Sequence, residues 1–212
     1  AICSGYLHSF YDRIVHSFAS MAMQRAGAPI SAVTSMFETL QNIKHTVRTC
    51  HGESERSFGG EDWREVAPLH GIGQGNGAGP AVWAVISTVF FYLLRDKGYG
   101  FKLNTPLSDN KIHLAGCGFV DDTDILQIGT FTDDYYSVAL KLQEAITWWE
   151  RCTKVSGGAV VPHKSWYGLV HFSWNEGDWE YSSDITDKQL QIRDMSGMET
   201  NLEILNPHDA KR

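Results

Sequence analysis

Two adjacent carboxylates stand between apolar segments in the middle of the chain. Asp121 and Asp122 follow Phe119 and Val120, and apolar stretches flank the group at 112–120 and 123–129. This pattern predicts a β-hairpin with the acids at its tip. Neighbouring carboxylates repel each other unless a divalent cation or a basic group lies between them. A bare Asp-Asp pair is more often a solvated turn, and the flanking strands are what favours a metal site here.

A sheet and helices must position this hairpin, and the spacing of apolar residues predicts both. Helices are expected at 12–26, 30–49, 78–97 and 133–154. Strands are expected at 101–103, 112–120, 123–129, 165–174 and 178–182. The polar part at 50–70 predicts a loop or short strands, and the tail after 190 is weakly patterned. The fold class expected is α+β, an antiparallel sheet with helices over one face.

Composition narrows the class of protein. With 212 residues and 42% hydrophobic content, the chain can bury a real core. The longest apolar run, 81–94, suits a buried helix better than a bilayer span, so no membrane segment is predicted. Four scattered cysteines argue against a zinc knuckle or a disulfide scaffold and favour a reducing, intracellular compartment. A net charge of −7 gives no global electrostatic reason to expect a polyanionic partner.

Two other residue types could carry function. The nine histidines include no His-x-x-x-His pair, so surface or core roles are favoured over metal binding. Several of the seven tryptophans fall late in the chain and could form a base-stacking platform. Core packing and strand pairing are the favoured alternatives, because large aromatic side chains are usually buried.

A resemblance to a known family rests on four motifs in order. Phe119-Val120-Asp121-Asp122 resembles the aromatic-x-Asp-Asp motif of reverse transcriptases. The other motifs resemble the Gln-Gly loop and helix of motif B (71–80), the motif D turn ending in lysine (157–164) and the end of motif A (10–14). Together they cover roughly residues 1–170, and the surrounding sequence resembles retrotransposon enzymes.

The resemblance implies a polymerase palm, whose first strand would be residues 1–7, and RNA-directed DNA polymerisation by two-metal-ion phosphoryl transfer. It implies Mg²⁺ or Mn²⁺ as cofactor, and an RNA or DNA template with primer and dNTPs as partners. The residues it assigns are Asp121 and Asp122 for metal binding and catalysis, Lys164 as a proton donor, and Tyr11, Gln74, Gly75 and Phe119 for nucleotide binding. Four of these residues have a simpler alternative role. Gln74 and Gly75 could form a loop that caps the next helix, Lys164 could be a surface lysine, and Tyr11 could be part of the core.

One position departs from the family. Motif A opens with an aspartate five residues before the aromatic position, and this chain has Tyr6 there. Asp12 follows the aromatic position and is not expected to replace it, and a tyrosine cannot bridge two divalent ions. Weak or absent polymerase activity is therefore expected.

The resemblance begins at motif A, so residues 1–212 are expected to be a palm fragment with fingers and thumb largely missing. Two other functions stay open. One is an inactive palm remnant that serves at most as a nucleic-acid or protein binding surface. The other is an unrelated metal-dependent transferase that uses Asp121 and Asp124. The oligomeric state is left undetermined.

Overall fold

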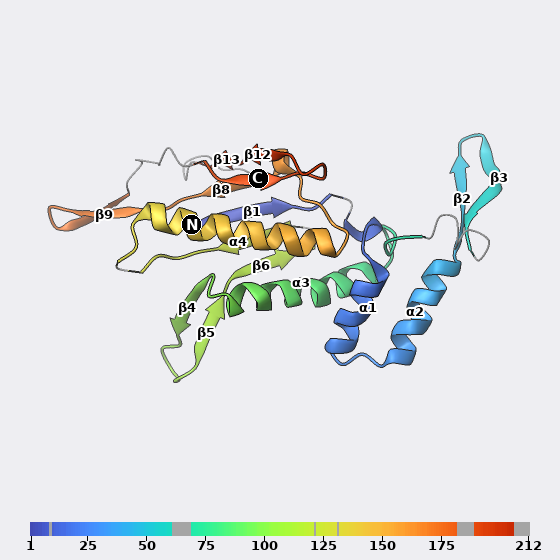
Figure 1. Ribbon diagram of the computed structural model, residues 1–212, viewed down its shortest axis with the longest axis horizontal. Helices are drawn as coiled ribbons and strands as arrows, with labels where there is room; N and C mark the ends of the chain where they lie inside the picture. The colour runs from blue at the N-terminus through green and yellow to red at the C-terminus, as the bar shows by residue number, and fades with distance from the viewer. Residues whose placement is uncertain (9, 61–68, 121, 131, 182–188, 206–212) are drawn as a thin grey trace. The chain divides into compact units, whose positions relative to one another are not determined.

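The computed structural model describes residues 1–212 except 9, 61–68, 121, 131, 182–188 and 206–212. The chain forms two compact units (Figure 1). Unit 1 consists of Ala1–His8 and Ser87–Arg212, and unit 2 is Ser9–Ile86. Each unit is described by itself.

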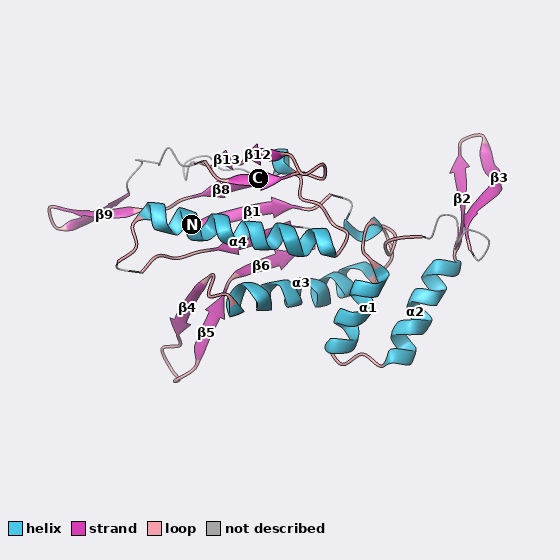
Figure 2. Cartoon of the chain, viewed as in Figure 1, coloured by secondary structure: helices cyan, strands magenta, loops and turns pink. Residues whose placement is uncertain are grey.

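A five-stranded sheet forms the centre of unit 1 (Figure 2). Its order is β13-β8-β1-β7-β6, and all neighbours are antiparallel except β13 and β8. The strands are β1 (Ile2–Tyr6), β6 (Gly116–Phe119), β7 (Asp122–Leu126), β8 (Trp166–Gly168) and β13 (Glu203–Ile204). The predicted first strand and the predicted hairpin are therefore present and lie side by side.

Two long helices complete the core of unit 1. They are α3 (Gly79–Asp96), which enters unit 1 at Ser87, and α4 (Tyr135–Val155). The chain order β1, α3, β6, β7, α4, β8 is the split β-α-β topology, in which β1 lies between β7 and β8. The structure is thus α+β, as the sequence predicts.

Both helices pack on the same face of the sheet. Phe90 of α3 meets Trp149 of α4 edge to face, with ring centroids 5.5 Å apart. A Cβ added at Gly116 of β6 would lie 2.7 Å from the Phe91 ring, so glycine is what lets α3 approach this strand. Along α4, one stripe is buried: Ala139, Leu142, Ala145, Ile146 and Trp149. This stripe follows the helical period that predicts the helix.

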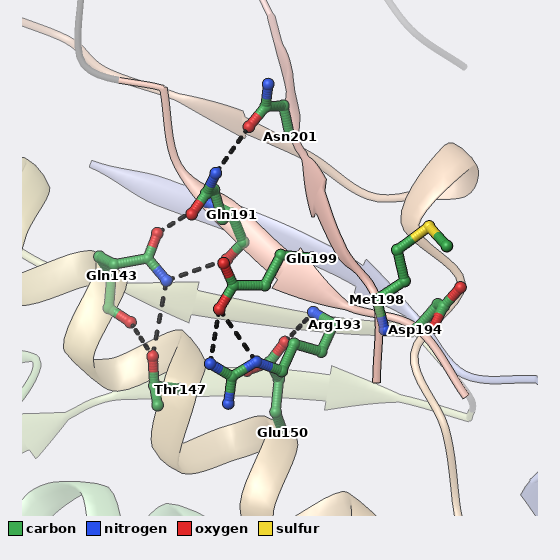
Figure 3. A network of polar contacts seen from close by, with 9 residues as sticks. All are labelled: Gln143, Thr147, Glu150, Gln191, Arg193, Asp194, Met198, Glu199 and Asn201. Atoms are coloured by element: carbon green, nitrogen blue, oxygen red, sulfur yellow. Dashed lines mark hydrogen bonds and ion pairs between the residues drawn. The ribbon is translucent and has the colours of Figure 1, made fainter. Parts of the chain in front are cut away.

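A short C-terminal hairpin packs on α4, although the tail after 190 shows little pattern in the sequence. Its strands are β11 (Gln191–Arg193) and β12 (Glu199–Asn201). Figure 3 shows the contacts that attach it to the helix. The Gln143 amide exchanges two hydrogen bonds with the backbone of Gln191, at 2.7 and 2.9 Å, and the Glu150 carboxylate accepts the backbone N–H of Arg193.

Unit 2 begins with a short 3-10 turn, η1 (Phe10–Asp12), and two helices, α1 (His16–Arg25) and α2 (Ile30–Asn42). The prediction of one helix over 30–49 is wrong in its last third, because β2 (Lys44–Thr49) pairs there with β3 (Gly52–Gly59). Three of the six residues of β2, Thr46, Val47 and Thr49, are β-branched and fit a strand better than a helix. The helix of 12–26 starts later than predicted, at His16.

Two more hairpins belong to unit 1. One joins β4 (Phe101–Asn104) to β5 (Lys111–Leu114), and the other joins β9 (Phe172–Asn175) to β10 (Asp178–Tyr181). The predicted strand 112–120 is therefore wrong as a single strand, because it divides between β5 and β6 in separate sheets. The break falls at Ala115, whose carbonyl accepts the N–H of Leu126. The predicted strand 165–174 divides in the same way into β8 and β9.

None of the helices in the described part of the chain has both the length and the apolar character needed to cross a bilayer.

Candidate functional site

The tip of the β6–β7 hairpin carries the aromatic-x-Asp-Asp motif. Phe119 and Asp122 are register partners, and Val120 lies in the connection between the strands. Asp121, predicted as the main metal ligand, lies outside the described residues. Phe119 is 78% exposed and Asp122 is exposed.

Val120 has a backbone φ of 56°, in the left-handed region. A β-branched side chain is a genuine outlier there, at a cost of order 1–3 kcal/mol. Such strain persists only where the surrounding structure imposes it, and it is concentrated at functional sites. The turn that carries the motif is therefore held in a conformation that its own residues disfavour.

Tyr6 lies next to this hairpin, at the end of β1. It is the register partner of Asp122, which in turn is the partner of Phe119. Directly opposed residues on adjacent antiparallel strands project from the same face of a sheet. Tyr6, Asp122 and Phe119 therefore form a row across three strands.

The row lies on the sheet face opposite the helices. Thr123 and Ile125 of β7 are buried, so the alternation along the strand places Asp122 and Asp124 on the other face. Cys117 of β6 is the partner of Asp124, and its thiol donates to the carboxylate at 3.9 Å. We call this surface the acidic face: Tyr6, Cys117, Phe119, Asp122 and Asp124. The alternation of Cys117 with Phe119, and of Asp122 with Asp124, is the sequence signal that could have identified it.

Lys164 packs against Tyr6. Its Nζ lies 4.4 Å from the centroid of the Tyr6 ring, a cation–π contact worth roughly 0.5–1 kcal/mol at an exposed site. The turn η3 (Pro162–Lys164) is tied to β1 by hydrogen bonds on both sides. Val161 N–H donates to the Tyr6 carbonyl at 2.9 Å, and the Ser165 hydroxyl accepts the Tyr6 N–H at 3.3 Å. The contact between Ser165 and Tyr6 was not predicted, because the two residues lie 159 positions apart in the sequence.

The thiols near this face are held in the neutral form. Burial raises the pKa of Cys3 to about 12, with a further contribution from the Asp124 charge. Burial also raises the pKa of Cys117, and Asp124 adds to the effect through its charge and its hydrogen bond. At neutral pH neither thiol is therefore a thiolate, which is the form that binds metals or attacks electrophiles.

The donor groups on this face do not complete a divalent-metal site. Within the described residues, no cluster of three or more His, Cys, Asp or Glu side chains is arranged to hold an ion. A phenol stands opposite Asp122, and a lysine ammonium lies over that phenol. Mg²⁺ and Mn²⁺ require several hard oxygen ligands, which this set lacks without a third carboxylate.

The remaining predicted residues, Tyr11, Gln74 and Gly75, lie in unit 2. Here the glycine-rich loop packs directly on the turn formed by Tyr11 and Asp12. Ile72 N–H donates to the Tyr11 carbonyl at 2.6 Å, and Gln74 N–H donates to the Asp12 carboxylate at 3.0 Å. The Asp12 carboxylate therefore holds the loop through a hydrogen bond to its backbone.

Two glycines allow this close approach in unit 2. A Cβ at Gly71 would lie 2.3 Å from the Asp12 backbone, and φ there is +75°. A Cβ at Gly79 would lie 3.2 Å from the Tyr11 ring. Glycine richness in 71–79 therefore has a packing reason, and the loop contacts both Tyr11 and Asp12.

Neither a protein-family model nor a curated protein matches this chain.

Proposed function

We propose that this chain is the palm of a reverse transcriptase-like polymerase, of retroelement type, in which RNA-directed DNA synthesis is impaired by Tyr6. The observation that carries the proposal is the register of Tyr6 with Asp122. A two-metal polymerase needs a carboxylate from a neighbouring strand beside the acids of the hairpin. Position 6 is that neighbour, and it bears a phenol.

Three further observations support the proposal. The split β-α-β topology puts the paired-acid hairpin at one end of the central strand β1. The aromatic-x-Asp-Asp turn is strained at Val120. The glycine-rich loop packs on Tyr11, in line with the roles that the resemblance assigns to both in contacting the nucleotide.

The proposal assigns roles to the chain's own residues. Asp121 and Asp122 would bind Mg²⁺ or Mn²⁺, and Phe119, Tyr11, Gln74 and Gly75 would contact the incoming dNTP and the template. Lys164 would donate a proton to the leaving pyrophosphate as the primer 3′-oxygen displaces it. Because the described donors lack a third carboxylate, the metal is expected to bind only weakly in the chain as it stands.

The second candidate function is an inactive palm remnant that acts as a binding surface. The contact between Lys164 and Tyr6 favours it, because an ammonium group held over the phenol provides a fixed positive charge on the acidic face. A positive charge beside the carboxylates would partly balance them, as a bound metal would otherwise do.

Restoring the missing acid tests both functions. Template-primed dNTP incorporation with Mg²⁺ or Mn²⁺ is compared for the native chain, Tyr6→Asp and Tyr6→Phe, and Mn²⁺ affinity is measured by electron paramagnetic resonance. We expect Tyr6→Asp to bind Mn²⁺ at least about tenfold more tightly than Tyr6→Phe, since one added carboxylate at this distance is worth over a kilocalorie. Asp122→Asn in the Tyr6→Asp background should abolish that gain.

The outcomes separate the two candidates. Incorporation by Tyr6→Asp alone supports an impaired polymerase. Metal binding by Tyr6→Asp without incorporation supports the inactive remnant. Full activity in the native chain, or no gain in Mn²⁺ affinity for Tyr6→Asp, would contradict the role given to position 6.

A further inference from the structure

A pocket of about 280 Å³ lies in unit 1 between α4 and the β11–β12 hairpin, and we call it the α4–hairpin pocket. Polar side chains of both elements line it (Figure 3): Gln143, Thr147, Glu150, Gln191, Arg193 and Glu199. Pockets for drug-sized ligands measure roughly 300–1,000 Å³, so this one suits a smaller molecule. Its polar wall means that hydrogen bonds and charge decide which molecule fits.

Many hydrogen-bond donors of this wall are used within the protein. The Gln143 amide donates to the Gln191 carbonyl and the Thr147 hydroxyl donates to the Gln143 carbonyl, both at 2.9 Å. Two nitrogens of the Arg193 guanidinium donate to the Glu199 carboxylate, at 2.5 and 3.1 Å. The Arg193 backbone N–H donates to the Glu150 carboxylate.

Carboxylate oxygens are left over as acceptors. The bonds that Glu150 and Glu199 accept all end on their Oε1 atoms, and no residue in the described part of the chain donates to their Oε2 atoms. The charged side chains that line the pocket are these two carboxylates and the Arg193 guanidinium, so the pocket carries one net negative charge. A ligand that complements it donates hydrogen bonds and is positively charged. A primary ammonium group has three donors and no acceptor.

Glu150 is the carboxylate that gains most from a cation. Its side chain is half-buried, and no ion pair joins it to a lysine or arginine side chain among the described residues. Burial raises the pKa of its carboxyl, and the hydrogen bond and charge of Arg193 oppose this shift only in part. Because a partly desolvated charge interacts more strongly than one in water, a cation beside Glu150 is held more firmly than one on the open surface.

We propose that the α4–hairpin pocket binds a small organic cation through its primary ammonium group, with Glu150 as the main acceptor. A free amine and the lysine side chain of a peptide both carry this group. An anion is disfavoured by the net negative charge of the pocket. A divalent metal ion is disfavoured because two carboxylates beside a guanidinium offer too few hard oxygen ligands. The proposal does not depend on the proposed polymerase function.

Butylammonium is the probe, because it carries the alkyl chain and the ammonium group of a lysine side chain. Amide NMR spectra of the full ¹⁵N-labelled chain are recorded at neutral pH with butylammonium, butanol or butyrate. We expect butylammonium to shift the N–H signals of Gln191 and Arg193, which donate to Gln143 and Glu150, with a Kd of about 1 mM. Butanol and butyrate should give no saturable shift, because they lack the positive charge.

Glu150→Gln is the decisive variant, since it keeps an oxygen for the Arg193 N–H and removes the charge. Butylammonium should bind it at least about tenfold more weakly, because hydrogen bonds to charged groups are the strong ones. Glu144→Gln is the matched control. It removes one carboxylate from the same helix, outside the pocket wall, and keeps an oxygen for the Tyr99 hydroxyl, so the Kd should not change.

Thr147→Lys provides a second, independent variant. Thr147 lies three residues before Glu150 on α4, so a lysine there can place its own ammonium beside the carboxylate. It should block butylammonium binding while the other amide signals show a native fold.

Nα-acetyl-lysine amide, titrated alongside, distinguishes the two sources of the ammonium group. Binding of this probe as tight as that of butylammonium supports a peptide lysine, and binding of butylammonium alone supports a free amine. A Kd above about 10 mM for butylammonium in the native chain overturns the proposal. Equal binding by Glu150→Gln and the native chain also overturns it. So does equal weakening by Glu150→Gln and Glu144→Gln, which would indicate diffuse attraction to a negatively charged protein.

Discussion

Tyr6 ends a row of three side chains that runs across β1, β7 and β6. A carboxylate at its position would face Asp122 across one strand spacing, the separation at which two acids can share a cation. A phenol there removes the third hard ligand and instead supplies a ring on which Lys164 rests. In the proposed palm, the residue type at position 6 would therefore decide between a metal ligand and a contact between the protein's own groups.

Glu150 provides a residue-scale prediction. Burial raises the pKa of its carboxyl above 4.5, although the Arg193 backbone and charge oppose the shift. The folded state therefore holds this proton more tightly than the unfolded chain, and the free energy of unfolding falls as pH rises through the interval above 4.5. Glu150→Gln keeps an oxygen that accepts the Arg193 N–H and loses the charge, so this part of the pH dependence should vanish.

Urea unfolding between pH 4 and pH 8 measures the effect. Glu150→Gln should be more stable than the native chain at pH 7 and nearly equal to it at pH 4. The matched change Glu176→Gln, in the exposed turn of β9–β10, is the control for the loss of one carboxylate. If the stability of Glu150→Gln and of the native chain depended on pH in the same way, burial would not raise the pKa of the Glu150 carboxyl.

At the scale of elements, the β6–β7 hairpin stores strain in its turn. Val120 is held at a φ of 56° and is 42% exposed, so little packing opposes its replacement. Val120→Gly relieves roughly 1–3 kcal/mol of strain. Glycine is more flexible than valine in the unfolded chain, and this lowers the free energy of unfolding by about 0.5–1 kcal/mol. We expect a net gain of about 1 kcal/mol in the free energy of unfolding.

Val120→Ala is the control for this prediction, because alanine keeps a Cβ and therefore most of the strain. Urea or thermal unfolding of the three proteins gives the comparison. A loss of stability in Val120→Gly similar to that in Val120→Ala would mean that the turn is not strained. Since the turn carries the paired acids, the Val120→Gly change should also be introduced into Tyr6→Asp to learn whether Mn²⁺ affinity depends on the fixed turn.

For the whole molecule, charge limits the partners. The net charge of −7 opposes association with a polyanion, and the acidic face adds to the repulsion. We expect the native chain to bind a labelled template-primer only weakly, with a Kd of about 10⁻⁴–10⁻⁶ M or above at physiological salt, the range of non-specific binding. Fluorescence anisotropy at 50 and 200 mM salt measures this.

The salt series also identifies the kind of contact. Weak binding that declines steeply with salt indicates a local cluster of lysines and arginines acting on phosphates. Nanomolar binding that is insensitive to salt would contradict the expectation and would indicate a nucleic-acid surface that charge does not reveal. Tyr6→Asp serves as a control, because one further negative charge should weaken binding slightly.

Elements with strong local patterns were predictable. The helices α3 and α4 lie within a residue or two of 78–97 and 133–154, because their apolar stripes repeat along the sequence itself. The hairpin strands were predictable from apolar runs in the sequence, whereas the first strand was expected from the resemblance to a polymerase palm. Predictions failed where a strand pairing decided the outcome: β2 replaces the end of a helix, and the segments 112–120 and 165–174 each divide between two sheets.

Three features can be read directly from the amino-acid sequence: the paired acids between apolar segments, the glycine-rich loop before a long helix and the net negative charge. Three others depend on the folded chain: Tyr6 stands opposite Asp122, Lys164 lies over the Tyr6 ring, and the Asp12 carboxylate accepts the backbone N–H of Gln74. These contacts join residues far apart in the chain through sheet register and long-range hydrogen bonds, which local periodicity does not encode. The chemistry of the site therefore depends on the part of the fold that no single segment specifies.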